Sequence, residues 1–327
     1  MTFAHHRHAA HCESGVMSNL FSHHGMPISE AMTFGLSSAL SFAYLPFIKL
    51  SGLPLIAYRQ PPRSIIKGLA KRLGAEFRFE TFRSPAAGQA RLDALLAQGC
   101  VVGLQTSVYW LPYFPEDMRF HFNAHNILVY GKEGDDYLIS DPVTEQTVRC
   151  AAAALSRARF AKGVLAPKGL LYTLVKPGQL TLTAADARKA ILKTCRVMQA
   201  PIPLIGVRGI RMLANKVAKL DPTAAASALY VGHIVRMQEE IGTGGAGFRF
   251  LYAAFLQEAA ALSGLEILAE FAERLIAIGD EWRAFALAAA RMVKGRDAMH
   301  PQTLADMLHG LAEQEKGFFR DLKMAVT

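Results

Sequence analysis

A cysteine near the start of the chain is the residue best suited to chemistry. Cys12 precedes residues 13–24, a stretch in which four apolar residues recur at helical spacing: Val16, Met17, Leu20 and Phe21. The pattern predicts a helix that starts beside Cys12 and stops at Gly25, a residue suited to left-handed termination. Unpaired N–H groups and the positive end of the helix dipole would stabilise the nucleophilic thiolate. The alternative is that Cys12 is a small buried hydrophobic residue, as most isolated cysteines are.

A histidine and an aspartate are candidates to activate this thiol. Two β-patterned runs, 122–130 and 137–141, are joined by a polar, glycine-containing link and predict an antiparallel hairpin. A turn centred near Glu133 places His125 opposite Asp141, where the Asp carboxylate could fix the imidazole tautomer. The other ring nitrogen would then accept a thiol proton. The alternatives are a surface His–Asp pair without function, or a register shifted by one residue, which places the two side chains on opposite faces.

These residues lie in the first of two regions that differ in composition. Residues 1–178 mix strand and helix patterns and predict an α+β domain, whereas residues 179–327 are rich in Ala and Leu at helical period and predict an all-helical domain. Within the first region, 42–54 is expected to be loop and short strand because it is aromatic and broken by proline. Within the second, a long helix over 264–294 is expected to break near Gly279.

Composition excludes several classes of protein. The net charge is +9, which could favour nucleic acid, an acidic membrane surface or an acidic protein partner. The Lys and Arg residues are scattered and no nucleic-acid motif is present, so we expect no nucleic-acid partner. No apolar run is long enough for a membrane span, and the N-terminus lacks a signal-peptide layout. The chain has four cysteines, Cys12, Cys100, Cys150 and Cys195, and they form no CxxC pair. This spacing favours reduced thiols and a cytoplasmic location.

Two further features are weak signals for a cofactor. Histidines gather near the N-terminus, but their spacing fits no zinc pattern, so we expect no metal and instead an arm that is mobile or lines the active site. The glycine-rich segment 241–247 precedes a helix and could hold a phosphate or carboxylate. No strand precedes it and no P-loop lysine follows, which favours a tight turn between helices.

Several motifs together resemble the butirosin biosynthesis protein H family. The resemblance spans nearly the whole chain, and its N-terminal motifs are more specific than its C-terminal ones. The matching segments are His11-Cys12-Glu13-Ser14, Ile28-Ser29-Glu30-Ala31-Met32-Thr33-Phe34-Gly35, Tyr109-Trp110-Leu111-Pro112-Tyr113, Ala124-His125-Asn126-Ile127-Leu128-Val129-Tyr130-Gly131, Ser140-Asp141-Pro142, Gly244-Gly245-Ala246-Gly247-Phe248-Arg249 and Leu251-Tyr252-Ala253-Ala254-Phe255-Leu256.

This resemblance implies a papain-like, cysteine-peptidase-type N-terminal domain, related to the bacteriocin-leader peptidases, with Cys12, His125 and Asp141 as the catalytic triad. It implies an acyltransferase of natural-product biosynthesis. An acyl or aminoacyl group would pass from an acyl carrier protein thioester to Cys12, and from there to an amine of a small-molecule acceptor. The founding member uses an aminoglycoside. No cofactor of its own is implied, because the partner protein carries the phosphopantetheine. The basic surface suits such a carrier, which is typically acidic.

The resemblance is imperfect at the oxyanion hole. Papain-like peptidases usually place a glutamine shortly before the nucleophile, and here that place is taken by His6. The N–H of Cys12 could supply part of the hole, with Gln105 as an alternative side-chain donor. Three more residues of the family motifs are candidates for binding the oxyanion or the substrate: Glu13, Glu30 and Tyr109.

Two other functions use the same features. A cysteine peptidase, amidase or thioesterase would employ the same triad with water as the acceptor. A non-catalytic binding module would use the helical region for docking or dimerisation, and helices such as 248–262 could pair across a two-fold axis as a homodimer.

Overall fold

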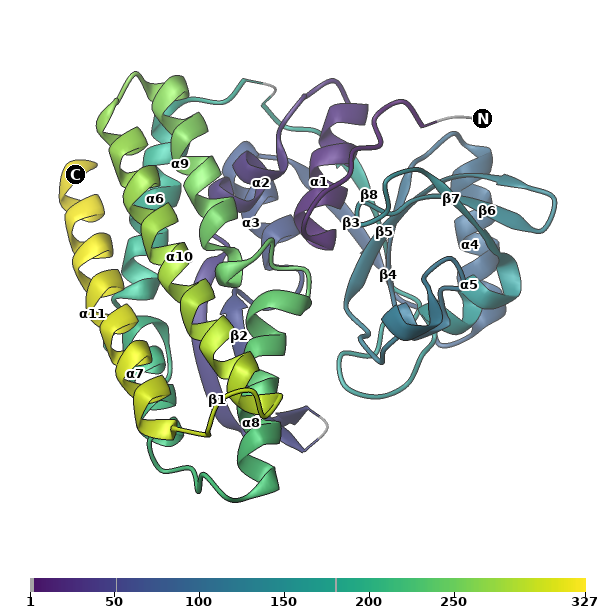
Figure 1. Cartoon of the computed structure of the whole chain (residues 1–327). Helices are drawn as coiled ribbons and strands as arrows, with labels where there is room; N and C mark the ends of the chain where they lie inside the picture. The colour runs from purple at the N-terminus through teal and green to yellow at the C-terminus, as the bar shows by residue number, and fades with distance from the viewer. Residues whose placement is uncertain (1–2, 51, 180) are drawn as a thin grey trace. The chain divides into compact units, whose positions relative to one another are not determined.

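The computed structural model describes residues 3–50, 52–179 and 181–327, apart from the side chain of Leu50 (Figure 1). Its contacts divide the chain into two compact units. The first comprises residues 1–33 and 65–181, and the second comprises 34–64 and 182–327. This division differs from the predicted boundary at 178/179, because residues 34–64 belong to the second unit.

The first unit is built on a six-stranded antiparallel sheet with the strand order β3-β8-β4-β5-β6-β7. The strands are β3 (Glu76–Glu80), β4 (Val102–Thr106), β5 (His125–Glu133), β6 (Asp136–Ser140), β7 (Val148–Ala151) and β8 (Leu171–Lys176). The helices are α1 (Cys12–His23), α3 (Ser64–Leu73), α4 (Pro85–Ala97) and α5 (Ala152–Arg159), with short 3₁₀ turns at η1 (Val108–Trp110) and η2 (Glu116–Met118). Apolar residues of α4, α5 and the central strands form one buried core: Leu92, Leu95, Val102, Leu104, Ile127, Val129, Ile139 and Leu155 among them.

The helix that carries Cys12 has the ends predicted from the sequence. His11 is its N-cap and accepts a hydrogen bond at its side chain from the N–H of Ser14. Gly25, with φ of +85°, follows the last turn in the left-handed conformation that a glycine adopts without strain. The helix packs against β5, which starts at His125. Local sequence therefore places the thiol at a helix N-terminus, and packing brings that helix to the strand of the histidine.

The hairpin of β5 and β6 forms, but its register differs from the prediction. The pairing Glu133↔Asp136 places the turn at residues 134–135, and Gly134 there has φ of +59°. A β-bulge at Tyr130 then inserts one extra residue into β5. Continued past the bulge, the register places Asp141 across from Ile127. His125 is therefore a diagonal neighbour of Asp141, whereas the prediction placed the two directly opposite.

The bulge decides which face these side chains share. Without the extra residue, the turn register would place Asp141 across from Leu128 and so on the opposite face from His125, because side chains alternate along a strand. The bulge shifts the pairing by one residue and restores a common face. The predicted contact between His125 and Asp141 thus forms although the predicted pairing was wrong by two residues.

The second unit is mostly helical. It contains the two-stranded antiparallel sheet of β1 (Leu40–Leu50) and β2 (Leu53–Arg59), so strand takes up more of 42–54 than the predicted loop and short strand. Its helices are α6 (Ala184–Met198), α7 (Gly206–Val217), α8 (Ala225–Val235), α9 (Arg249–Ser263), α10 (Ile267–Val293) and α11 (Pro301–Ala325), with short turns η3 (Arg236–Glu240) and η4 (Ala246–Phe248). The strand β1 packs against α6 and α7, and two of its aromatic residues, Phe42 and Tyr44, are buried, whereas Phe47 is exposed. Helix α2 (Glu30–Leu36) connects the two units.

Two glycine features of the second unit were singled out in the sequence: Gly279 and the segment 241–247. Helix α10 continues through Gly279, so the predicted break does not occur. A Cβ at this position would lie 2.6 Å from the ring of Phe250, so the missing side chain makes room for this aromatic ring of α9. In the segment 241–247, the N–H of Ala246 donates to the carboxylate of Glu239 at 3.1 Å. The segment thus holds the chain's own anion and forms a turn between helices, the interpretation that the sequence favoured.

A buried ion pair joins helices α9 and α11 of the second unit. Arg249 and Glu315 are fully buried and make a bidentate contact, with nitrogen–oxygen distances of 2.8 and 3.0 Å. The indole N–H of Trp282 donates to the same carboxylate at 2.7 Å. Full pairing offsets much of the cost of removing both charges from water.

The predicted fold class is confirmed: an α+β unit with an antiparallel sheet and a helical C-terminal half. Over the ranges described above, none of the helices combines the length and the apolar character that a membrane crossing requires.

Candidate active site

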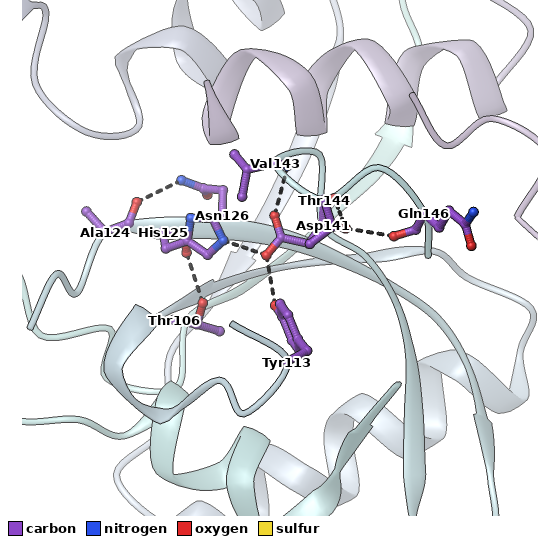
Figure 2. Close-up of polar contacts among 9 residues, drawn as sticks. All are labelled: Thr106, Tyr113, Ala124, His125, Asn126, Asp141, Val143, Thr144 and Gln146. Carbon is purple, nitrogen blue, oxygen red and sulfur yellow. Dashed lines mark hydrogen bonds and ion pairs between the residues drawn. The ribbon is translucent and has the colours of Figure 1, made fainter. Parts of the chain in front are cut away.

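The predicted histidine and aspartate form a buried pair. His125 Nε2 lies 2.7 Å from Asp141 Oδ2, and the side chains are 5% and 0% exposed (Figure 2). His125 is the first residue of β5, and Asp141 follows the last residue of β6. An ionised carboxylate accepts the hydrogen from Nε2 and leaves Nδ1 as the second functional nitrogen.

Two further groups orient the carboxylate of Asp141. The hydroxyl of Tyr113 donates to Oδ2 at 2.8 Å, the same oxygen that accepts from His125 (Figure 2). The N–H of Val143 donates to Oδ1 at 3.2 Å. Burial, reinforced by the charge of Asp141, raises the pKa of Tyr113 well above its ordinary value, so this hydroxyl remains a donor at physiological pH.

The environment favours a protonated imidazole. Burial alone would lower the pKa of His125, but the charge and hydrogen bond of Asp141 outweigh it, and Cys12 adds both a hydrogen bond and a charge interaction. Together they raise the pKa of His125 to about 10. The same interactions identify Cys12 as a direct neighbour of His125. Cys12 and Asp141 are therefore both neighbours of the His125 imidazole.

Cys12 is held by the turn that precedes it. The carboxylate of Glu30 accepts hydrogen bonds from the N–H groups of Ala10 and His11, at 2.9 and 2.8 Å, and from the hydroxyl of Ser14 at 2.9 Å. Burial raises the pKa of Glu30, while these three donors and the charge of His8 oppose that rise. Glu30 is thus a residue that shapes the first turn of α1 around the thiol, which is only 6% exposed.

The structure assigns other partners to several predicted binding residues. The carboxylate of Glu13 accepts from the N–H groups of Ile65 and Ile66, so it caps α3. The amide nitrogen of Gln105 donates to the carbonyl groups of Asn123 and Leu165, at 2.8 and 3.0 Å, which uses both of its hydrogens. Gln105 thus donates to carbonyl groups of the protein itself.

The two remaining candidates, His6 and Tyr109, also have contacts within the protein. His6 contacts Ser140 Oγ at 2.8 Å and the carbonyl oxygen of Thr144 at 3.2 Å, so both ring nitrogens are engaged beside Asp141 and neither is free to hold an oxyanion. Tyr109 is 39% exposed and its ring stacks on His121 at 4.0 Å. At the first position of a helix, the backbone N–H of Cys12 remains the donor that the geometry offers to an oxyanion.

Sequence reasoning did not single out Tyr113. It lies in one of the motifs quoted above, but its role depends on a loop that follows β4 and returns to the end of β6, and no local spacing signals that return. The functions of Glu30 and His6 likewise appear only when segments distant in sequence come together.

A cavity of about 600 Å³ lies beside α1. Its lining includes Arg7 and His8 of the N-terminal segment, Asn19 of α1, and Glu30. This volume is within the range of small-molecule sites. Over residues 3–50, 52–179 and 181–327, His, Cys, Asp and Glu side chains form no group of three arranged to hold a metal ion.

Comparisons with known proteins give two family matches. Residues 11–142 match the N-terminal domain of butirosin biosynthesis protein H, and residues 153–322 match a domain of unknown function (DUF4872). No curated protein sequence matches the chain. Among solved structures, a putative C39-like peptidase from Bacillus anthracis is similar over 54% of this chain and 97% of its own, with 13% identity and a TM-score of 0.38.

Proposed function

This chain belongs to the butirosin biosynthesis protein H family, and we propose that it is an acyltransferase whose nucleophile is Cys12. The observation that carries the proposal is the buried pair of His125 and Asp141, at 2.7 Å, with Cys12 as the next neighbour of the imidazole. A histidine fixed by a carboxylate and adjacent to a cysteine at a helix N-terminus is the arrangement that activates a thiol.

The first half-reaction forms an acyl-enzyme. The Cys12 thiolate attacks the carbonyl carbon of a thioester on the phosphopantetheine arm of an acyl carrier protein. Collapse of the tetrahedral intermediate breaks the bond to the leaving sulfur, which takes a proton from the His125 imidazolium. The product is a new thioester on Cys12 and a free carrier thiol. The backbone N–H of Cys12 faces the negative charge that develops on the carbonyl oxygen.

The second half-reaction transfers the acyl group to an amine. His125, now neutral, accepts a proton from the attacking amine as the carbon–nitrogen bond forms. The Cys12 sulfur leaves as a thiolate, which restores the ion pair with His125. Asp141 keeps the imidazole in one tautomer throughout both steps. The exchange of a thioester for an amide is downhill, which suits a cysteine intermediate.

Charge supports a carrier protein as the donor. The net charge of +9 would attract an acidic partner and make association sensitive to salt.

Intact-protein mass spectrometry tests this function. The full chain is incubated with acyl carrier proteins loaded with short acyl and aminoacyl thioesters. We expect an acyl adduct on the unaltered protein and none on Cys12→Ala, whereas the control Cys100→Ala retains it, because Cys100 lies before β4 and outside the site. An adduct that persists in Cys12→Ala refutes the assignment.

Added amines separate transfer from hydrolysis. We expect an acceptor amine to discharge the acyl-enzyme faster than water and to appear in an amide product. Discharge at one rate with and without amine, yielding only free acid, would show a hydrolase with the same residues. No adduct from any thioester, combined with ordinary thiol reactivity of Cys12, would show a non-catalytic binding module.

A further inference from the structure

The N-terminal segment 3–9, called the strap below, contacts the loop that holds Asp141. The ring of His6 contacts Ser140 Oγ at 2.8 Å and the carbonyl oxygen of Thr144 at 3.2 Å. The N–H of Ala9 donates to the carbonyl oxygen of Pro142 at 2.6 Å. These contacts bracket Asp141, since they reach the residue before it, the residue after it and a residue three positions on.

The hydrogen-bonding chemistry defines the state of the His6 ring. A carbonyl oxygen only accepts, so Nε2 must carry a hydrogen and donate to Thr144. In the neutral ring Nδ1 then accepts from the hydroxyl of Ser140. Thr144 also turns back on the same loop: its hydroxyl donates to the carbonyl oxygen of Asp141 at 2.8 Å. His6 therefore joins the two ends of one tight loop.

The strap is itself anchored on the elements of the site. Phe3 is 7% exposed, and its ring stacks on Tyr130 of β5 with a centroid distance of 5.3 Å. The same ring contacts His23 of α1. The strap thus connects the helix of Cys12, the strand of His125 and the loop of Asp141.

A glycine allows the three segments to approach closely. A Cβ at Gly15, one turn after Cys12, would lie 2.6 Å from Cβ atoms of both Ala9 and Pro142. Real Cβ atoms do not tolerate such distances, so strap, loop and helix meet at a position that only glycine fits.

We propose that His6 is a positioning residue, which holds the Asp141 loop so that its carboxylate points at His125 Nε2. The proposal rests on the proposed function, because it acts through the same pair. His6 occupies the place where papain-like peptidases usually carry a glutamine, but in this chain its ring contacts both ends of the loop behind the aspartate. Loss of both bonds frees the loop to turn, which lengthens the contact between Asp141 and His125 and weakens the imidazolium beside Cys12.

The test compares His6→Ala with His6→Gln in the full chain. The glutamine amide carries an acceptor and a donor, so it can reproduce both contacts of the ring. The readout is the rate of Cys12 alkylation by iodoacetamide across pH, measured by mass spectrometry of the Cys12 peptide. We expect His6→Ala to raise the pH midpoint of Cys12 alkylation by about one pH unit, because the variant loses both hydrogen bonds of the ring. This shift corresponds to roughly a tenfold loss of alkylation rate at neutral pH.

Rescue and controls separate positioning from general damage. His6→Gln should restore most of the profile, and His309→Ala, at a half-buried histidine of the second unit, should leave it unchanged. Ser140→Ala removes one of the two partners and should move the midpoint in the same direction by less, which provides a second measurement should His6→Ala fail to fold. A lower melting temperature without any change in the profile, in either His6→Ala or Ser140→Ala, overturns the proposal.

Failure of this proposal and failure of the function are distinct. If unaltered Cys12 alkylates at low pH but the His6 and Ser140 variants do the same, the positioning role is wrong and the acyltransferase stands. If the unaltered protein has an ordinary thiol profile and forms no acyl adduct, the function itself is wrong and His6 has nothing to position.

Discussion

Replacing Asp141 by asparagine removes one charge from a fully buried pair. Burial lowers the pKa of His125, but the charge and hydrogen bond of Asp141, together with those of Cys12, raise it from 6.5 to about 10. At about 1.4 kcal/mol per pH unit, this difference corresponds to roughly 5 kcal/mol. Coulomb's law gives about 6 kcal/mol for unit charges 2.7 Å apart at an effective dielectric constant near 20. Both values imply that Asp141→Asn leaves His125 neutral at pH 8.

The assay measures Cys12 alkylation by iodoacetamide and acylation by a carrier thioester across pH. Without an imidazolium beside it, the thiolate loses its counter-ion, and we expect the alkylation midpoint to rise by at least about one pH unit. Acylation should fall by roughly 10²- to 10⁴-fold, the usual contribution of a positioned acid or base. The matched control is Asp135→Asn, an exposed carboxylate in the turn of the same hairpin, which should change neither quantity.

Stability gives an independent readout with a defined sign. Folding raises the pKa of His125, so protonation of this residue stabilises the native state fully below about pH 6.5, and this contribution disappears as the pH rises through about 10. The free energy of unfolding of the unaltered chain should therefore decline between these pH values, by up to roughly 5 kcal/mol. Asp141→Asn should flatten this decline. An unchanged alkylation profile together with an unchanged slope would refute the reasoning.

Three other substitutions test the surroundings, each by urea denaturation. Tyr113→Phe removes the hydroxyl that donates to Asp141 at 2.8 Å and should lower the free energy of unfolding by roughly 1–3 kcal/mol. Its acylation rate should fall less than that of Asp141→Asn, and no change in either quantity would show that Tyr113 does not orient the carboxylate. Gly15→Ala should cost about 1–3 kcal/mol by overpacking against Ala9, and a neutral result would mean that the strap yields freely. Glu315→Gln leaves Arg249 buried without its counter-charge and should cost roughly 3–5 kcal/mol, whereas exposed Glu313→Gln should cost less than 1.

Local spacing was enough to predict several elements that carry the site. The apolar stripe of residues 13–24 and the glycine after it predicted α1. Such features depend on neighbours within a turn or two, so a sequence displays them directly. The predicted contact of His125 with Asp141 belongs to the same class, since one hairpin connects them.

Contacts between distant segments were decided only by tertiary structure. The β-bulge at Tyr130 set the face that His125 and Asp141 share, and no residue pattern marks it. Packing against α6 and α7 extended the strand structure through residues predicted to be loop and short strand. His6 and Tyr113 reach the Asp141 loop across 134 and 28 positions of sequence. Periodicity reports which side of an element is buried, but not what it is buried against, and the groups that orient the aspartate depend on the latter.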